Sequence, residues 1–285
     1  MCGIAGFVND MPIDVKCPVL QRMTDMIAHR GPDSEGHYID EHAALGHRRL
    51  SIIDLGGGQQ PIYNEDGSKV ITFNGEIYNY QTLREELIAA GHTFTTKSDT
   101  EVLLHGYEQW GVDLLQRVRG MFTFVIWDKN KQELFGARDH FGIKPFYYAK
   151  MNGTFMYASE IKSLLRHPDF VKELNAEALK PYMTFQYPAI GETFFKGVYK
   201  LPEGHYFTYR DGKMDIHRYY DEDFREGKQK LGELVNSIDQ TVCDSVKAHQ
   251  IADVEVGSFL SSGVDSSYVA AVARPQHTYS IGFGK

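Results

Sequence analysis

The sequence predicts an α+β fold for its first part, in which a packed sheet carries helices on its outer faces, and two patterns support this prediction. Short β-like segments separated by turn residues are frequent, and they lie at Gly3–Val8, Lys69–Phe73, Met121–Trp127, Glu133–Ala137, Phe146–Ala149 and Thr154–Ala158. Apolar residues with helical spacing lie among them, at Val19, Leu20, Met23, Met26 and Ile27, and again at Val102, Leu103, Leu104, Tyr107 and Trp110 after a start at Asp99 or Thr100. Since helices and strands do not alternate regularly, a doubly wound parallel sheet is disfavoured.

A change in composition divides the chain near residues 210–230. Asp211-Gly212 is followed by a charged run, Asp221–Lys228, which is typical of a linker. Beyond it, a helical pattern precedes Val254–Leu260, which predicts a buried strand that enters a Ser/Gly turn and another helix. We therefore expect a first domain at residues 1–210, a linker at 211–228 and part of an α/β domain at 229–285. The last segment, of about 60 residues, is too short for an ordinary nucleotide-binding sheet, so we expect a truncated second domain.

Charge and cysteine content narrow the class of protein. The formal net charge of −8 disfavours binding to nucleic acid or to an acidic membrane surface, and small polar substrates fit better. The apolar run Ile4–Val8 is too short for a signal peptide or a membrane-spanning helix. Cys2, Cys17 and Cys243 are odd in number and lack metal-ligand spacing, which favours a reducing compartment without disulfides. We expect a cytoplasmic protein.

Cys2 is a candidate nucleophile because of its position at the start of the chain. A cysteine thiol at its ordinary pKa is only a few per cent thiolate at neutral pH, so it needs a nearby base. If Met1 is removed, the new α-amine, with a pKa of roughly 7.7–8.0, lies on the same residue and can serve as that base. A cysteine near a terminus is by itself more often inert. Only its combination with other residues supports catalysis.

A second group of residues suits the binding of an α-amino acid. Asn74 and Gly75 follow an apolar strand, and an amide beside a backbone N–H can stabilise the oxyanion formed during acyl transfer. Arg49 could bind a carboxylate through two hydrogen bonds, while Glu76 and Asp99 could bind an ammonium group. Taken singly, each feature has an ordinary alternative. Asn-Gly is a strong hairpin-turn signal, and an isolated Arg49 or Asp99 is more often a surface charge or a helix cap.

Several motifs together resemble the class II glutamine amidotransferases, which use an N-terminal cysteine. They are Met1-Cys2-Gly3-Ile4-Ala5-Gly6, His29-Arg30-Gly31-Pro32-Asp33, His47-Arg48-Arg49-Leu50-Ser51-Ile52, Phe73-Asn74-Gly75-Glu76-Ile77-Tyr78-Asn79 and Ser98-Asp99-Thr100-Glu101. Within that superfamily, Arg138-Asp139-His140-Phe141-Gly142-Ile143-Lys144-Pro145 and Leu201-Pro202-Glu203-Gly204-His205 resemble the glutamine-hydrolysing asparagine synthetase family. The resemblance covers essentially the whole chain.

The resemblance implies a fold and a set of site residues for the first domain. The implied fold is a four-layer αββα sandwich, with Cys2 as the nucleophile and Asn74 and Gly75 as the oxyanion hole. Glutamine would be bound by Arg49, Leu50, Ser51, Ile52, Ile53, Asn74, Gly75, Glu76 and Asp99. We derive no chemical role for His29-Arg30-Gly31-Pro32-Asp33 and expect it to order the loop beside the site. Gly56-Gly57-Gly58 is interpreted as a flexible loop, because no helix or Lys-Ser/Thr pair follows it.

A Ser/Gly-rich motif in the second part predicts an anion site. Leu260-Ser261-Ser262-Gly263-Val264-Asp265-Ser266-Ser267 joins the predicted strand to a helix, so backbone N–H groups, hydroxyls and the helix dipole can meet a phosphate. The alternative is a Ser/Asp cap on a buried helix. The motif resembles the pyrophosphate loop of ATP-dependent synthetases, although Ser262 stands where those loops have their first Gly, which requires a backbone conformation open to non-Gly residues. The resemblance implies contacts to adenine at Leu260 and Ile281, binding of ATP and pyrophosphate at Ser261, Ser262, Gly263, Asp265, Ser266 and Ser267, and Mg²⁺ at Asp265.

The resemblance implies a reaction that joins two sites. Glutamine is hydrolysed at Cys2 without a cofactor, and the ammonia serves an amidation of aspartate to asparagine that uses ATP and Mg²⁺ and releases AMP and pyrophosphate. We expect the 285-residue chain to retain glutaminase activity only. One alternative is a class II amidotransferase for another adenylated carboxylate, and another is a catalytically silent fragment in which Met1 is retained. The sequence leaves the oligomeric state open, with a homodimer as one possibility.

Overall fold

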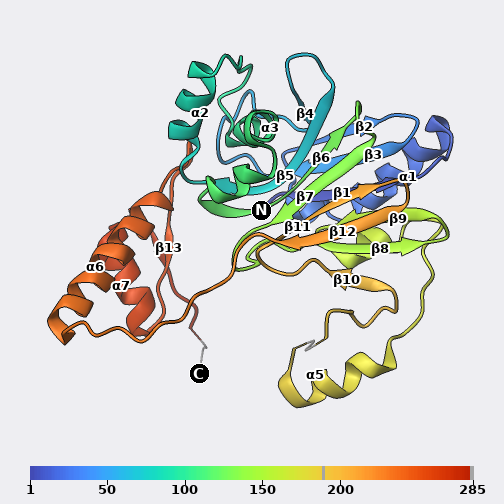
Figure 1. The fold of residues 1–285 in the computed structure, drawn as a ribbon. Helices are drawn as coiled ribbons and strands as arrows, with labels where there is room; N and C mark the ends of the chain where they lie inside the picture. The colour runs from blue at the N-terminus through green and yellow to red at the C-terminus, as the bar shows by residue number, and fades with distance from the viewer. Residues whose placement is uncertain (188–189, 283–285) are drawn as a thin grey trace. The chain divides into compact units, whose positions relative to one another are not determined.

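The computed structural model describes residues 1–187 and 190–282. The chain forms two compact units, Met1–Asp221 and Glu222–Lys285, and each is described here by itself. The first unit contains two six-stranded sheets (Figure 1). All of its strand pairs are antiparallel.

The first sheet has the strand order β10-β8-β9-β1-β3-β2. Its strands are β1 (Gly3–Val8), β2 (Ser34–Ile39), β3 (Ala43–Arg49), β8 (Tyr147–Met151), β9 (Thr154–Ala158) and β10 (Val198–Lys200). In β1 successive side chains point to opposite faces, so that Ile4 enters the core between the sheets whereas Ala5 and Phe7 pack on the helix side. The sheet is therefore buried on both faces at β1, which begins directly after Cys2.

The second sheet has the strand order β12-β11-β7-β6-β5-β4. Its strands are β4 (Ile62–Tyr63), β5 (Lys69–Ile77), β6 (Gly120–Asp128), β7 (Glu133–Arg138), β11 (His205–Arg210) and β12 (Lys213–Arg218). The predicted strand Lys69–Phe73 is thus longer than expected and includes Asn74 and Gly75, which pair with Thr123 and Phe122 of β6. The hairpin-turn interpretation of Asn74-Gly75 was wrong, because strand pairing continues through both residues to Ile77.

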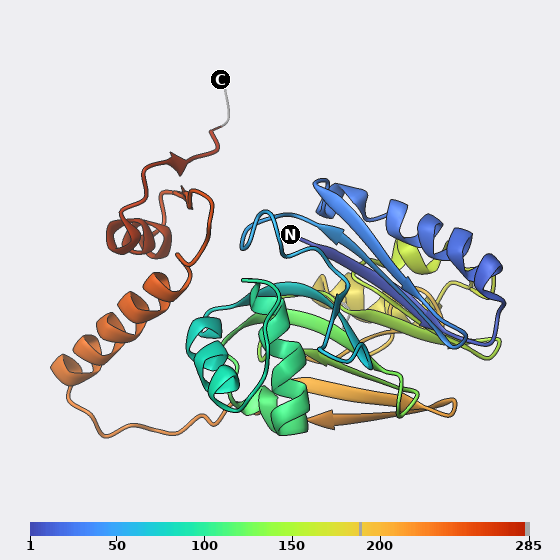
Figure 2. The same cartoon turned by 90° about the horizontal axis from the view of Figure 1, so that it is seen from above.

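Helices cover the outer faces of the two sheets. Helices α1 (Ile13–Asp25) and α4 (Ile161–Leu164) pack on the first sheet, and α3 (Asp99–Trp110), with α2 (Tyr80–Ala89) beside it, packs on the second. Figure 2 shows α1 on one side of the sheet pair and α2 and α3 on the other. This arrangement confirms the four-layer αββα prediction. The remaining short helices of the unit are η1 (Ala28–Arg30), η2 (Gly111–Gln116), η3 (Ala176–Ala178) and α5 (Leu179–Phe185).

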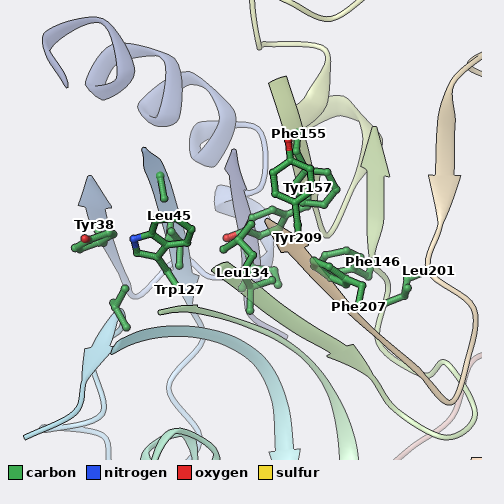
Figure 3. Packing of buried hydrophobic residues seen from close by; sticks show 14 residues of the cluster. Tyr38, Leu45, Trp127, Leu134, Phe146, Phe155, Tyr157, Leu201, Phe207 and Tyr209 are labelled. Carbon is green, nitrogen blue, oxygen red and sulfur yellow. The ribbon is translucent and has the colours of Figure 1, made fainter. Parts of the chain in front are cut away.

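Large apolar side chains from both sheets fill the space between them. Trp127, Leu134 and Phe207 of the second sheet meet Leu45 and Tyr157 of the first in one buried cluster (Figure 3). Burying such side chains contributes roughly 1.5–3 kcal/mol each, so this core fixes the two sheets against each other. The rigid sandwich in turn fixes the ends of β1, β3 and β5, where the predicted site residues lie.

The end of the first unit differs from the predicted linker. Residues 213–218, which we expected in a linker at 211–228, form β12 and pair along their length with β11. Asp211 and Gly212 form the turn between these strands, with φ of 51° and 73°. Positive φ at both central residues is the geometry of a tight hairpin turn, which Asp-Gly favours. The Asp-Gly pair therefore marks a hairpin, and the first unit extends to Asp221.

The second unit contains α6 (Leu231–Ala248), β13 (Ser258–Phe259), α7 (Val264–Ala273) and β14 (Thr278–Tyr279). The two strands pair in parallel. The predicted buried strand Val254–Leu260 was too long and is not buried, since only its Ser258–Phe259 part forms a strand and Phe259 is 79% exposed. The physical reason is that β14 is the single strand that pairs with it in the described part of this unit.

Candidate active site

Cys2 lies immediately before β1 and is contacted by the backbone of Leu50 and the side chain of Arg30. Its Sγ atom accepts a hydrogen bond from the N–H of Leu50 at 3.4 Å and lies 3.5 Å from the carbonyl oxygen of the same residue. Its carbonyl oxygen accepts a hydrogen bond from Nε of Arg30 at 2.9 Å. Burial raises the pKa of the Cys2 thiol, and the contact with Leu50 acts in the opposite direction. The thiol is therefore mostly protonated and needs a base.

The motif around Arg30 anchors the segments beside Cys2. The Arg30 guanidinium also pairs with Glu160 at 3.1 Å, and Glu160 accepts a further contact from His29 at 2.9 Å. Asp33 accepts a hydrogen bond from the N–H of Ser51 at 2.8 Å. These contacts agree with the expected ordering role of residues 29–33.

A cavity of about 280 Å³ opens beside Cys2. It brings together eight of the nine residues expected to bind glutamine, namely Arg49, Leu50, Ile52, Ile53, Asn74, Gly75, Glu76 and Asp99. The ninth, Ser51, is not among the lining residues. The cavity volume is near the lower end for small-molecule sites, which suits a ligand of amino-acid size.

Asn74 presents a buried amide to this cavity. The side chain is 1% exposed, and neither Oδ1 nor Nδ2 has a hydrogen-bond partner within the described residues. A buried polar group without a partner costs about 1–3 kcal/mol, so the amide is suited to a ligand that supplies one. Gly75 follows on the same strand, where a Cβ atom would lie 2.2 Å from the carbonyl oxygen of Met121. Only glycine fits this close approach of β5 to β6.

Arg49 is buried at the end of β3 and organises the segment after it. One of its terminal nitrogens donates to the carbonyl oxygens of Ile53 at 3.0 Å and Asp54 at 2.6 Å, and the other lies 3.5 Å from the carbonyl oxygen of Leu55. Guanidinium has five N–H donors, so these contacts leave donors that can point at a carboxylate. The surface-charge alternative for Arg49 was wrong, because the side chain is buried in the cavity wall.

Asp99 and Glu76 place two carboxyl groups near each other in the cavity wall. Ser98 caps α3 by accepting from the N–H of Thr100, so Asp99 is not the cap and is instead buried. Its Oδ2 accepts a hydrogen bond from the N–H of Ile77 at 3.0 Å. Burial raises the pKa of Asp99 to about 7, and the charge of Glu76 adds to this effect. A cationic ligand group would relieve the repulsion between these two carboxyl groups.

In the second unit, the predicted Ser/Gly motif forms a loop between β13 and α7. The loop is closed internally, since the Ser261 and Ser266 hydroxyls lie 2.8 Å apart and the N–H of Gly263 donates to Ser261 Oγ at 3.2 Å. Gly263 precedes α7, and Asp265 lies in its first turn. Ser262 does not adopt a positive φ, so the position expected to need backbone freedom accommodates a serine without strain.

The sequence of the first unit matches a known family. Residues 1–220 match the glutamine amidotransferase domain. The chain belongs to the glutamine amidotransferase domain family. Residues 237–285 match the asparagine synthase family. Both matches confirm the resemblance on which the site residues were expected.

Two curated relatives align with almost all of this glutamine amidotransferase chain. It is 45% identical over 291 residues to the glutamine-hydrolysing asparagine synthetase 1 of Bacillus subtilis (strain 168), covering 99% of this chain and 46% of the relative. It is 36% identical over 299 residues to asparagine synthetase 3 of the same strain, covering 99% of this chain and 48% of the relative. The chain thus spans about half the length of these relatives.

A solved structure shares the fold. The glutamine phosphoribosylpyrophosphate amidotransferase from B. subtilis, complexed with ADP and GMP, matches with a TM-score of 0.57 and 18% identity, covering 96% of this chain and 64% of that one. At this identity the likeness shows the fold alone. Among the described residues, no helix is long and apolar enough to cross a membrane. Cys2, Cys17 and Cys243 are free cysteines.

Lys144 and Gln60 are among the cavity-lining residues that the sequence analysis did not predict. Lys144 lines the cavity and is buried, and burial lowers the pKa of its ammonium group. The sequence could have indicated Lys144, because this residue lies inside the motif Arg138–Pro145, which resembles the asparagine synthetase family. Gln60 also lines the cavity and links β5 to α3, accepting from the N–H of Phe73 at 2.6 Å and donating to Thr100 at 3.2 Å. The Gly/Gln-rich stretch before Pro61 gave no signal for this role.

Proposed function

We propose that this domain hydrolyses glutamine to glutamate and ammonia, with Cys2 as the nucleophile after removal of Met1. The observation that supports this most strongly is the unpartnered, buried Asn74 amide in the same cavity as the Cys2 thiol. An N–H of that amide, together with a backbone N–H at Gly75, suits an oxyanion that forms only during acyl transfer. The Asn74 amide has no other hydrogen-bond partner among the described residues.

In the proposed reaction, each of these groups has a separate role. The free α-amine of Cys2 accepts the thiol proton, and the sulfur attacks the side-chain carbonyl carbon of glutamine. The C–S bond forms as the carbonyl π electrons move to the oxygen beside Asn74 and Gly75. Collapse of this intermediate breaks the C–N bond, and the leaving nitrogen takes the proton from the amine to depart as ammonia. Water then attacks the thioester, releasing glutamate and restoring the thiol.

Substrate selection is proposed to depend on both ends of the amino acid. Arg49 binds the α-carboxylate, Glu76 and Asp99 bind the α-ammonium, and the backbone of Leu50, Ser51, Ile52 and Ile53 shapes the wall. Glutamine with a blocked α-amine or α-carboxylate is expected to lose most of kcat/KM, since either block leaves a buried charge unpaired. Comparable rates with blocked and free glutamine would reject this site assignment.

We further propose that, in the whole protein, the ammonia serves an ATP-dependent amidation of aspartate to asparagine. Support comes from the names of the B. subtilis relatives and from the match of residues 237–285 to the asparagine synthase family. The loop Ser261–Ser267 at the start of α7 has hydroxyls, backbone N–H groups and a carboxylate, which suit pyrophosphate and Mg²⁺. Asp265 would bind the Mg²⁺, while Leu260 and Ile281 would contact adenine. The test is a measurement of ATP binding to the chain in the presence of Mg²⁺. We expect pyrophosphate to compete with ATP for the wild-type chain, and we expect Asp265→Ala to lose this competition.

A further inference from the structure

A second group of polar side chains lies away from the Cys2 cavity, on the outer side of the second sheet. It comprises Glu65 after β4, His92 after α2, and His105 and Glu108 on α3. The imidazole nitrogen or carboxylate oxygen that each offers lies within 4.8 Å of the other three. Figure 1 shows α3 beside α2 and β4, so that three separate segments meet at this group. The proposed glutamine reaction uses none of these four residues.

We propose that Glu65, His92, His105 and Glu108 form a zinc site. Two imidazoles and two carboxylates are ligands that Zn²⁺ takes in tetrahedral geometry. With Zn–N and Zn–O bonds of roughly 2.0–2.2 Å, neighbouring donor atoms of a tetrahedron lie about 3.4 Å apart. The proposal therefore requires donor separations close to that value without rearrangement of the backbone.

Several donor separations lie near this value. Nδ1 of His105 lies 3.0 Å from Glu108 Oε2 and 3.4 Å from Glu65 Oε2. Nδ1 of His92 lies 3.3 Å from Glu65 Oε1 and 4.0 Å from Glu108 Oε2. His105 and Glu108 are three residues apart on α3 and so share one helix face. Glu65 faces the two histidines with different oxygens, so its side chain must rotate for one oxygen to bind the ion.

The outer contact of His92 fits metal ligation. A ligating histidine usually donates its second N–H to an oxygen atom, which fixes the ring. Nε2 of His92 lies 3.3 Å from the side-chain oxygen of Gln109. Nε2 of His105 lies 3.5 Å from Glu101 and makes no hydrogen bond within the described residues. Glu101 is itself held by the N–H and hydroxyl groups of Thr95 and Thr96, between 2.6 and 3.0 Å.

Further contacts hold the remaining ligands in place. Phe94 packs edge-on against the His105 ring with centroids 4.7 Å apart. Oε1 of Glu108 accepts a hydrogen bond from the side-chain amide of Asn64 at 2.6 Å, so Oε2 is the oxygen that faces the proposed ion. Oε1 of Glu65 accepts from the N–H of Thr93 at 3.0 Å. The group is thus pre-organised, and the partial exposure of Glu65 gives the ion a route of entry.

The competing account is an ion-pair network without a metal. Burial lowers the pKa of His105, but the neighbouring carboxylates of Glu101, Glu108 and Glu65 outweigh it and raise that pKa to about 9. Protonated His105 would then face three carboxylates, with Lys69 at 3.5 Å from Glu108 as a further cation. Zn²⁺ would neutralise both ligating carboxylates, while Glu101 would remain paired with the neutral His105 ring. Measured zinc binding decides between the two accounts.

The test is titration of the chelator-treated 285-residue chain with Zn²⁺, followed by calorimetry and by metal analysis after desalting. We expect one Zn²⁺ per chain, and a tetrahedral visible spectrum when Co²⁺ replaces it. Glu65→Gln and His92→Asn should each weaken Zn²⁺ binding at least tenfold, because each removes one ligand. The side chains of Glu65 and His92 are both partly exposed, so circular dichroism is expected to show that each variant keeps the wild-type fold.

A matched control is available in the second unit. His277 and Glu255 form a single exposed pair 3.3 Å apart, and His277→Gln should leave zinc affinity unchanged. Failure of the folded wild-type chain to bind a stoichiometric ion would overturn the proposal. Equal binding by wild type, Glu65→Gln and His92→Asn would overturn it as well. Glutaminase activity is not the readout, so the proposed function and the zinc site are tested separately.

Discussion

Nε of Arg30 donates a hydrogen bond to the carbonyl oxygen of Cys2 at 2.9 Å. The residue that precedes β1 is therefore held by a side chain from η1, which is in turn paired with Glu160 beyond β9. Two segments that are distant in sequence thus fix the position of the proposed nucleophile. This contact places a positioning residue next to the reacting sulfur.

Arg30→Met should lower kcat for glutamine hydrolysis by about ten- to a hundredfold with little change in KM. The reason is that a displacement of about 1 Å at a reacting group costs up to about a hundredfold in rate. Steady-state kinetics measure the effect. Arg166→Met, which changes an exposed arginine, is the control and should leave kcat unchanged. A kcat near wild type in Arg30→Met would show that this contact does not position Cys2.

Asn74→Ala should lower kcat by about 10²–10³-fold, because one oxyanion donor is lost. Its stability should be unchanged or higher, since the substitution removes a buried amide that has no partner. Parallel measurement of kcat and of the thermal unfolding midpoint checks both parts. A large drop in Tm with unchanged kcat would mean that Asn74 is structural.

Gly75→Ala should destabilise the first unit by at least about 1–3 kcal/mol, because its Cβ would meet the Met121 carbonyl oxygen at 2.2 Å. Urea unfolding measures this change. Gly56→Ala provides the control, since its Cβ would meet nothing within 4 Å. Equal stability of the two variants would contradict the close strand approach.

The raised pKa of Asp99, about 7, predicts a pH-dependent stability. Between its ordinary pKa near 4 and about 7, the folded state binds the proton that the unfolded state has lost. The stabilisation from Asp99 is therefore full below pH 4, declines as pH rises to about 7 and is then constant, with an upper bound of about 4 kcal/mol. Asp99→Asn should accordingly gain stability relative to wild type between pH 4.5 and 7.5. If the unfolding free energies of Asp99→Asn and wild type differ by the same amount at pH 4.5 and at pH 7.5, the predicted pH dependence is wrong.

The sequence predicted the layers and the site better than the boundaries. The short β-like segments Gly3–Val8 and Thr154–Ala158 predicted β1 and β9 at their observed bounds, and side chains on both faces of these strands are buried. Asp211-Gly212 was misassigned to a linker, since local composition does not reveal a following edge strand. The reach of β5 through Asn74-Gly75 depends on pairing with β6. Such pairing over some 50 residues leaves no local signal.

Some site residues could be predicted from sequence motifs, whereas others are recognised only from their contacts in the fold. Arg49, Asn74 and Asp99 lie in motifs that a family shares, so their convergence on one cavity was expected. Gln60 lies in a stretch that resembles a loop, and its role follows only from contacts with Phe73 and Thr100. The His92 and His105 cluster likewise joins segments with no common motif, and only the packing of α2 against α3 brings them together.

The central claim is that Cys2 hydrolyses glutamine as the first residue of the chain. The most direct measurement is intact mass combined with glutamate release by the same purified sample, alongside Cys2→Ala. We predict a mass that lacks Met1, steady glutamate release by wild type and none by Cys2→Ala. Glutamate release by a chain that retains Met1, or by Cys2→Ala, would contradict the account.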